Sequence, residues 1–174
     1  MKIKILILSL MLAFSLNGIA QKVNKKYQDP KLEKEVLVGY CNIEGMEEGV
    51  FGVYFRTQHE TYHPKSSITN KIKTILSQGN YKIVTVFGDW CSDSKLQMGR
   101  FYKVLEYAEV PATKMTWIGV DGSKKVEGMD ISEYQILRVP TFIVYLNDKE
   151  IGRIVESPKF TLEKDLYSIL KSVK

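Results

Sequence analysis

One of the two cysteines of the chain stands where a predicted strand turns into a predicted helix, in the segment Trp90-Cys91-Ser92-Asp93-Ser94. At a helix start, free backbone N–H groups and the positive end of the helix dipole stabilise a thiolate relative to a thiol. Ser94 returns to the same side of the first turn, where its hydroxyl can donate a hydrogen bond to the sulfur of Cys91. Because the thiolate is the nucleophile, this spacing favours thiol chemistry at Cys91.

Charged neighbours act on this thiol in opposite directions. Lys95 adds positive charge that favours the thiolate, whereas Asp89 and Asp93 add negative charge that raises the pKa of a thiol. The sequence therefore leaves the direction of the net pKa shift of Cys91 open.

The second cysteine, Cys41, lies within an apolar, strand-like run over Val36–Ile43. Free cysteine is among the residue types most often buried, so we expect Cys41 to be an unreactive part of the core. The alternative is that Cys41 resolves or bridges Cys91. The sequence gives no distance between the two sulfurs, so both interpretations stay open.

A further segment imitates a metal site. Residues 59–63 read His-Glu-Thr-Tyr-His, a pattern that binds zinc only when both histidines share one helix face and a third ligand completes the site. Pro64 follows His63 directly and disfavours helical geometry there, and the chain has no other histidine. We therefore expect a solvated loop and no metal site.

The elements that must position Cys91 follow from the apolar pattern. Tyr81–Phe87 is typical of a strand buried on both faces, and a helix with an apolar face follows Cys91 directly. Upstream, Ser66 or Ser67 is placed to cap a helix that ends near Gly79. Downstream, the sequence predicts a strand over Met115–Val120, a short helix over Ile131–Leu137, a hairpin of strands over Thr141–Leu146 and Ile151–Val155, and a last helix capped by Thr161.

Two expectations concern the N-terminal part. Residues 21–35 are polar and lysine-rich and predict a flexible arm. Val36–Ile43 and Val50–Arg56 predict a β-hairpin joined by a polar turn over Glu44–Gly49. The element order from residue 36 onwards requires a mixed sheet, because parallel strands need helical crossovers and the last hairpin adds an antiparallel edge.

Two segments of the chain resemble thioredoxins. Val84–Ser94 resembles the family's active-site strand and turn, and Tyr134–Thr141 is similar to the segment that ends at the family's cis-proline. The resemblance spans roughly residues 66–172. It implies an α/β, thioredoxin-like fold over residues 36–174, with a mixed central β-sheet flanked by helices and the predicted β-hairpin as an N-terminal extension.

The resemblance also implies a binding site and exposes three departures. It implies that Pro140 is cis and packs beside Cys91, that the backbone of Val139 pairs with an extended partner peptide, and that Trp90 supplies an apolar wall. Ser94, however, replaces the family's second cysteine, so a mixed disulfide on Cys91 has no resolving thiol in the same motif. The other departures are Thr85 in place of a buried acid and Gly99 in place of a helix proline.

Residues 1–20 have the layout of a secretory signal peptide. Lys2 and Lys4 precede an apolar run over Ile5–Leu16. The small residues Gly18 and Ala20 occupy the −3 and −1 positions of a predicted cleavage site before Gln21. The run is about a dozen residues, shorter than the roughly 20 that span a bilayer. We expect an exported protein, periplasmic or secreted, with no stable membrane insertion after cleavage.

These observations predict an exported thiol–disulfide exchange protein that acts through Cys91, with Ser94 assisting, on partner proteins or low-molecular-weight thiols and disulfides. As an enzyme it would be a monothiol oxidoreductase or isomerase that needs no cofactor or metal. The alternative is a redox-inactive thioredoxin-fold module that binds peptides or acts like a chaperone. A net charge of +5 without a basic run predicts no nucleic-acid partner. The physiological substrate, the electron donor and the oligomeric state do not follow from the sequence.

Overall fold

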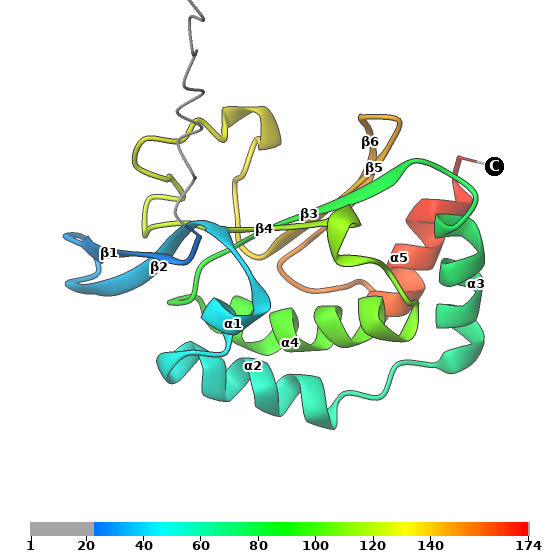
Figure 1. Cartoon of the computed structure of the whole chain (residues 1–174), viewed down its shortest axis with the longest axis horizontal. Coiled ribbons are helices and arrows are strands. Elements are labelled where there is room, and N and C mark those ends of the chain that lie inside the picture. The colour runs from blue at the N-terminus through cyan, green and yellow to red at the C-terminus, as the bar shows by residue number, and fades with distance from the viewer. Residues whose placement is uncertain (1–22, 174) are drawn as a thin grey trace, which may run out of the picture.

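A six-stranded mixed sheet forms the centre of the computed structural model, which describes residues 23–173. The predicted signal peptide lies outside the described residues. The strand order is β1-β2-β4-β3-β5-β6 (Figure 1). The strands are β1 (Lys25–Asp29), β2 (Lys34–Cys41), β3 (Tyr81–Phe87), β4 (Met115–Gly119), β5 (Thr141–Leu146) and β6 (Lys149–Val155).

Strand β3 lies at the centre, parallel to β4 and antiparallel to β5. The pairs β1 with β2, β2 with β4, and β5 with β6 are antiparallel. This arrangement confirms the predicted α/β, thioredoxin-like fold class with a mixed central sheet.

The helices lie on one side of this sheet, and the connection between β4 and β5 covers the other side (Figure 1). One apolar cluster joins the helices to the sheet, and a second joins the opposite face to the connection around Val126 and Ile131. The helices are α1 (Ile43–Met46), α2 (Gly49–Thr61), α3 (Ser66–Leu76), α4 (Ser92–Tyr107) and α5 (Leu162–Lys171), with one-turn 3-10 helices η1 (Ala112–Lys114) and η2 (Ser132–Tyr134).

Several predicted elements are confirmed. Strand β3 begins and ends at the predicted residues, and helix α4 follows Cys91 directly. Thr161 caps α5 as expected, with its hydroxyl accepting a hydrogen bond from the backbone N–H of Lys164 at 3.3 Å. The predicted capping of α3 by Ser66 or Ser67 is wrong: both serines lie inside the helix, and the N-cap residue Lys65 makes no side-chain cap hydrogen bond.

The predicted N-terminal hairpin is half wrong. The strand over Val36–Ile43 exists as β2, but residues 50–56 belong to helix α2. Phe51 and Phe55, four residues apart, bury one face of that helix against the core, whereas Val50 and Val53 stay exposed. A dense run of β-branched and aromatic residues fits strand or helix locally, and here the packing of α2 against α4 decides for helix.

The strand that pairs with β2 comes from the segment expected to be a flexible arm. Residues 25–29 form β1, in antiparallel register with β2. Asp29, only 2% exposed, fixes the turn by accepting hydrogen bonds from the backbone N–H groups of Lys31, Leu32 and Gly122. The hydrogen bond from Gly122, above all, holds the pKa of Asp29 below its usual value. These contacts convert a polar segment into an ordered edge strand.

The connection between β4 and β5 also differs from expectation. The predicted helix over Ile131–Leu137 is reduced to the single turn η2, and Gln135 ends it in a left-handed conformation with φ of 48°. Ile131 is buried in the second apolar cluster, so this connection takes the place of a helix on that face.

Close packing of α2 against α4 fixes the helix that carries the candidate site. Gly99 of α4 faces the backbone of α2, and a Cβ at this position would overlap the carbonyl oxygen of Phe55. The position where the resemblance leads one to expect a proline is therefore a contact that requires glycine. Within residues 23–173, no helix combines the length and apolar content needed to cross a membrane.

Candidate functional site

Cys91 occupies the N-cap position of α4, immediately beyond the end of β3. Its backbone N–H donates to the carbonyl of Gly88 at 3.0 Å, and its own carbonyl accepts from the N–H of Lys95 at 3.0 Å. The residue is half-buried, with φ of −83° and ψ of 133°. The predicted placement of the thiol at a helix start is therefore confirmed.

The proline loop lies directly against this thiol. The peptide bond between Val139 and Pro140 is cis, as the resemblance implied, and both residues are buried. The Cys91 Sγ–H donates a hydrogen bond to the carbonyl oxygen of Val139 at 3.2 Å. The loop is held in turn by the N–H of Glu156, which donates to the carbonyl of Pro140 at 2.7 Å. Residues nearly fifty positions apart thus meet at one site.

Trp90 lies beside the thiol and is fixed at its indole nitrogen. Its Nε1–H donates to the carbonyl of Val120, just beyond β4, at 2.9 Å. The indole packs over Gly88, where a Cβ would come within 2.6 Å of the ring. Trp90 and Cys91 both pack against the second apolar cluster. The ring is half-exposed, and its role as an apolar wall for a partner, which the resemblance implied, stays a prediction.

Ser94 makes a different contact from the one expected. Its side chain is fully buried, and its Oγ accepts a hydrogen bond from the N–H of Gly88 at 3.2 Å. Among the described residues, Ser94 makes no hydrogen bond with Cys91 Sγ, which instead donates to Val139. Ser94 therefore ties the end of β3 to the first turn of α4, which positions the backbone around the thiol.

Cys41 lies in the core, as we expected of an unreactive buried cysteine. It is 8% exposed, and its Sγ–H donates to the carbonyl of Gly39 at 3.3 Å. Burial raises the pKa of its thiol to about 12. Both cysteines are free, and they pack in different apolar clusters, Cys41 among the helices and Cys91 against the opposite cluster.

Thr85, which stands where the resemblance to thioredoxins leads one to expect a buried acid, is fully buried in the centre of β3. Its Oγ1 has no hydrogen-bond partner within the part of the chain that the structure describes. The position therefore carries a polar atom in an apolar site but no group that could accept a proton from Cys91 near neutral pH.

The segment with the zinc-like spacing was expected to be a loop, but its first histidine lies in a helix. His59 lies in α2, stacks against the ring of Tyr102 at a centroid distance of 5.3 Å, and has its Nε2 2.9 Å from Glu106 Oε2. His63 follows the end of the helix. Over residues 23–173, no group of three or more His, Cys, Asp or Glu side chains is arranged to hold a metal ion.

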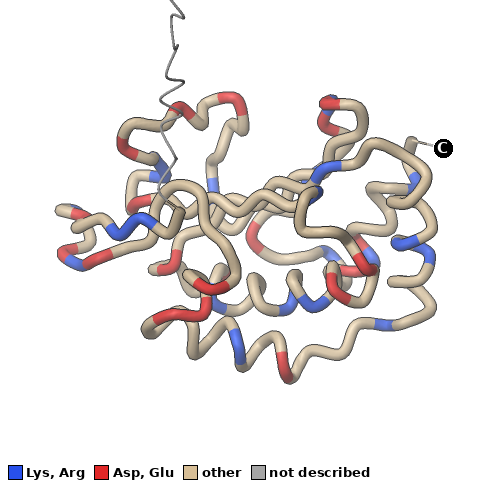
Figure 2. Tube along the Cα trace, in the orientation of Figure 1, with Lys and Arg blue, Asp and Glu red and all other residues tan. Residues whose placement is uncertain are grey.

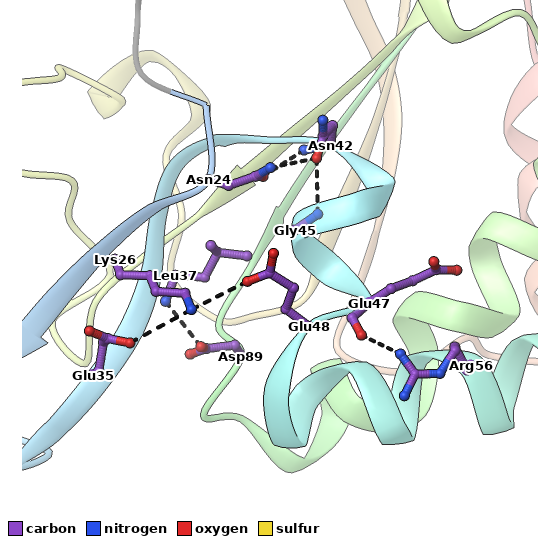
Figure 3. A network of polar contacts seen from close by, with 10 residues as sticks. All are labelled: Asn24, Lys26, Glu35, Leu37, Asn42, Gly45, Glu47, Glu48, Arg56 and Asp89. Carbon is purple, nitrogen blue, oxygen red and sulfur yellow. Dashed lines mark hydrogen bonds and ion pairs between the residues drawn. The ribbon is translucent and has the colours of Figure 1, made fainter.

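Asp89 has a larger place in the site than the sequence indicated. Its Oδ2 accepts a hydrogen bond from the backbone N–H of Leu37 in β2 at 3.0 Å, which ties the hairpin to the turn before Cys91 (Figure 3). Its Oδ1 is buried without a hydrogen-bond partner among the described residues. Burial raises the pKa of Asp89 above its usual value, although Leu37, Lys34 and Lys95 oppose the shift.

A pocket of about 350 Å³ adjoins Asp89. It lies between the β1–β2 hairpin, the junction of α1 with α2, and the start of α4, and we call it the hairpin pocket. Its lining includes Lys34, Phe51, Asp89, Trp90 and Lys95. Sequence reasoning missed it because Lys34 and Phe51 lie in the two segments that were predicted wrongly.

No family model and no curated protein matches the sequence. Among solved structures, the chain is similar to a protein of unknown function from Pseudomonas aeruginosa, with a TM-score of 0.50 and 13% identity over 76% of this chain and 86% of that one. It is also similar to an HIV epitope scaffold, with a TM-score of 0.49 and 12% identity over 75% of this chain and 85% of that one.

A mutant thioredoxin from Halobacterium salinarum is a further neighbour, with a TM-score of 0.36 and 14% identity over 64% of this chain and 86% of that one. At such identities the similarity concerns the fold alone. The sheet order and the site geometry of the described residues define the class: a protein of thioredoxin-like α/β fold with a half-exposed cysteine at a helix start, facing a cis-proline loop.

Proposed function

We propose that this protein carries out thiol–disulfide exchange through the single thiol of Cys91, on partner proteins or small thiols and disulfides. The observation that supports the proposal most strongly is the position of this sulfur. It begins helix α4, remains half-exposed, and lies 3.2 Å from the carbonyl oxygen of Val139 in the cis-proline loop. A helix start favours the thiolate, the form that attacks disulfides.

The exchange step needs no cofactor. Cys91 first loses its proton to solvent, and its thiolate attacks one sulfur of a disulfide in the partner. A bond forms between Cys91 and that sulfur while the disulfide of the partner breaks. The other sulfur leaves as a thiolate and takes a proton from solvent. The disulfide is transferred, so no separate oxidant or reductant is consumed.

Deprotonation of Cys91 also changes what Val139 can bind. The Sγ–H is the donor that the Val139 carbonyl accepts in the resting protein. Once that proton has gone, the carbonyl is open to an N–H group of an extended partner chain, which can pair with it as an added strand. Trp90 directly precedes Cys91, and Pro140 directly follows Val139 in the loop that faces the thiol.

Trapping and rescue test the proposal. Oxidised glutathione is expected to leave a persistent mixed disulfide on the wild type, detected as a mass increase, because Ser94 offers no resolving thiol. Cys91→Ser should abolish the adduct, and Cys41→Ser should retain it. Ser94→Cys should create a dithiol that reduces insulin at least about tenfold faster than the wild type, because attack within one helix turn has a high effective concentration.

Two outcomes would contradict this account. If the wild type forms no adduct at Cys91, the thiol chemistry fails and a redox-inactive peptide-binding module explains the site better. If Cys41→Ser prolongs an adduct that the wild type resolves quickly, Cys41 is the resolving thiol.

The proposal includes export from the cytoplasm. It is supported by the basic start, the short apolar run and the small residues Gly18 and Ala20. Mass spectrometry of the expressed protein is expected to find a chain that begins at Gln21 outside the cytoplasm. A membrane-bound product that retains Met1 would contradict export with cleavage.

A further inference from the structure

The sulfur of Cys91 does not bond to the helix start at which it stands. Cys91 is the N-cap residue of α4 and has the extended backbone that capping residues adopt, yet its side chain makes no cap hydrogen bond. A capping side chain accepts from the N–H group at the second or third helical position, which here belongs to Asp93 or Ser94. Within residues 23–173, neither of these N–H groups donates a hydrogen bond. The helix start is therefore open to an acceptor.

The sulfur is turned instead toward a carbonyl group. Among the described residues, its one hydrogen bond is donated to the carbonyl oxygen of Val139, at 3.2 Å. A carbonyl oxygen only accepts, so it can bond to a thiol but not to a thiolate, which is itself an acceptor. A hydrogen bond that only the neutral form makes favours that form. The contact with Val139 thus holds Cys91 as the thiol, whereas the open N–H groups of α4 suit the thiolate.

The cis-proline loop is anchored on both sides of the carbonyl that accepts from the sulfur. The hydroxyl of Thr141 donates to the carbonyl of Arg138 at 2.7 Å, and the N–H of Glu156 donates to the carbonyl of Pro140 at 2.7 Å. Rotation of the cysteine side chain about its Cα–Cβ bond, by contrast, moves the sulfur alone. Partly exposed side chains exchange staggered rotamers readily, so the sulfur is the part of this contact that can move.

Charges of both signs surround the sulfur. Figure 2 shows acidic and basic residues interspersed along the chain. The charged residues on the segments that meet at the thiol are Asp89, Asp93, Lys95, Arg138 and Glu156. Arg138 and Glu156 form an ion pair with an N–O distance of 2.8 Å. Because no single sign prevails among these residues, we attribute the choice between thiol and thiolate to the two hydrogen-bonding positions.

A partner chain competes with the sulfur for the same carbonyl. An extended chain that adds as a strand donates its N–H groups to carbonyls of this kind. Leu137 and Arg138, which lead into the loop, are exposed, so the approach to Val139 is open to solvent. Coupling between two binding events is reciprocal. If loss of the Sγ–H favours the partner, the bound partner must favour loss of that proton.

We propose that the sulfur of Cys91 is a two-position switch that responds to a bound partner chain. As the thiol, it donates to the Val139 carbonyl. As the thiolate, having lost its proton to solvent, it turns to accept from the N–H groups of Asp93 and Ser94. A partner N–H that bonds to Val139 displaces the Sγ–H and shifts Cys91 to the thiolate. The switch rests on the proposed function and adds its regulation: the nucleophile forms preferentially where an extended partner chain is bound.

The two positions of the sulfur are tested by NMR on the isotope-labelled protein. Between about pH 6 and about pH 10, ionisation of Cys91 is expected to move an N–H signal of Asp93 or Ser94 downfield and the carbonyl carbon signal of Val139 upfield, with a common midpoint. Cys91→Ala is the control and should show neither change. A Val139 signal that changes without any change at Asp93 and Ser94 would overturn the two-position switch.

The coupling to a partner is tested without thiol chemistry. The probe is the neutral peptide acetyl-valyl-S-methylcysteinyl-valine amide, which has backbone N–H groups but no reactive sulfur. Its affinity for the wild type should increase by about fivefold between about pH 6 and about pH 10, the effect of one hydrogen bond. The affinity of Cys91→Ala, which has no Sγ–H to displace, should not change with pH. The same peptide with N-methylated backbone amides should show no pH dependence with either protein.

The outcomes separate the switch from the proposed function. If oxidised glutathione forms the Cys91 adduct while binding of the N–H peptide is independent of pH, the switch is overturned and thiol exchange stands. If the N–H signals and the peptide affinity change as expected but no adduct forms, the switch stands and the proposed function fails. Absence of saturable peptide binding to both the wild type and Cys91→Ala would overturn the response to a partner chain.

Discussion

Two cysteines in the same chain have environments that predict opposite reactivity. Cys91 is half-exposed at a helix start, whereas Cys41 is 8% exposed and has a pKa raised by burial to about 12. At pH 7 a thiol with that pKa is ionised in only about one molecule in 10⁵. The difference in thiolate population and in access should govern labelling.

We therefore predict that iodoacetamide labels Cys91 at least about 100-fold faster than Cys41 in folded protein at pH 7. Peptide mapping after brief labelling measures the ratio. In denaturant the two should react at similar rates, since both environments are then lost. Equal labelling in the folded state would mean that the helix start does not activate Cys91.

Thr85 permits a second test at the residue scale. Its hydroxyl is buried without a partner among the described residues, and leaving a polar group so placed costs about 1–3 kcal/mol. Thr85→Val is expected to raise the free energy of unfolding by about 1 kcal/mol, measured by urea denaturation.

Thr141 supplies the matched control. It is as deeply buried, at 1% exposed, but its Oγ1 donates to the carbonyl of Arg138 at 2.7 Å. Thr141→Val should lower the free energy of unfolding by about 1–2 kcal/mol, because it removes the donor from a satisfied carbonyl. A change in the free energy of unfolding of the same sign in both variants would contradict the difference in hydrogen bonding.

At the scale of elements, the contact between α2 and α4 sets the position of the helix that begins at Cys91. Gly99 permits the approach, since a Cβ there would overlap the carbonyl of Phe55. Ordinary helix propensity favours alanine over glycine by about 1 kcal/mol, so the two effects oppose each other.

The steric effect should prevail. Gly99→Ala is predicted to lower the free energy of unfolding by about 1–3 kcal/mol, because the overlap is with backbone rather than with a flexible side chain. Glu60→Ala, on the exposed face of α2, is the control and should change it by less than about 0.5 kcal/mol. A stabilised Gly99→Ala would show that α2 can move away from α4 freely.

At the scale of the whole molecule, Asp89 links stability to pH. Burial raises the pKa of its carboxyl in the folded protein. The folded state then binds the proton more tightly than the unfolded state, so this stabilisation is complete at pH below the unfolded pKa and is lost as pH rises through the folded pKa.

We therefore predict that the free energy of unfolding of the wild type, relative to that of Asp89→Asn, is highest at low pH and falls as pH rises. Urea titrations at several pH values measure this difference, and the comparison cancels the contributions of the other carboxyl groups. A difference that grows with pH would show that Asp89 is stabilised as the carboxylate.

The sequence by itself determined those features of the protein that depend on residues close together in the chain. Continuous apolar character specified β3, its abrupt end placed Cys91 at the start of α4, and the resemblance of the segment before Pro140 to thioredoxins implied the cis bond. Each of these depends on local backbone preferences or on a short motif, which a sequence displays directly.

Only the tertiary structure decided the rest. Residues 50–56 suit a strand or a helix locally, and burial of Phe51 and Phe55 against α4 selected the helix. The polar segment 25–29 became a strand because β2 offered an edge and because Asp29 accepts hydrogen bonds from N–H groups of its own turn and from Gly122, in the distant loop after β4. The hairpin pocket needs both of these segments beside Asp89, so no local pattern could reveal it: its shape and its charges exist only after distant parts of the chain have packed together.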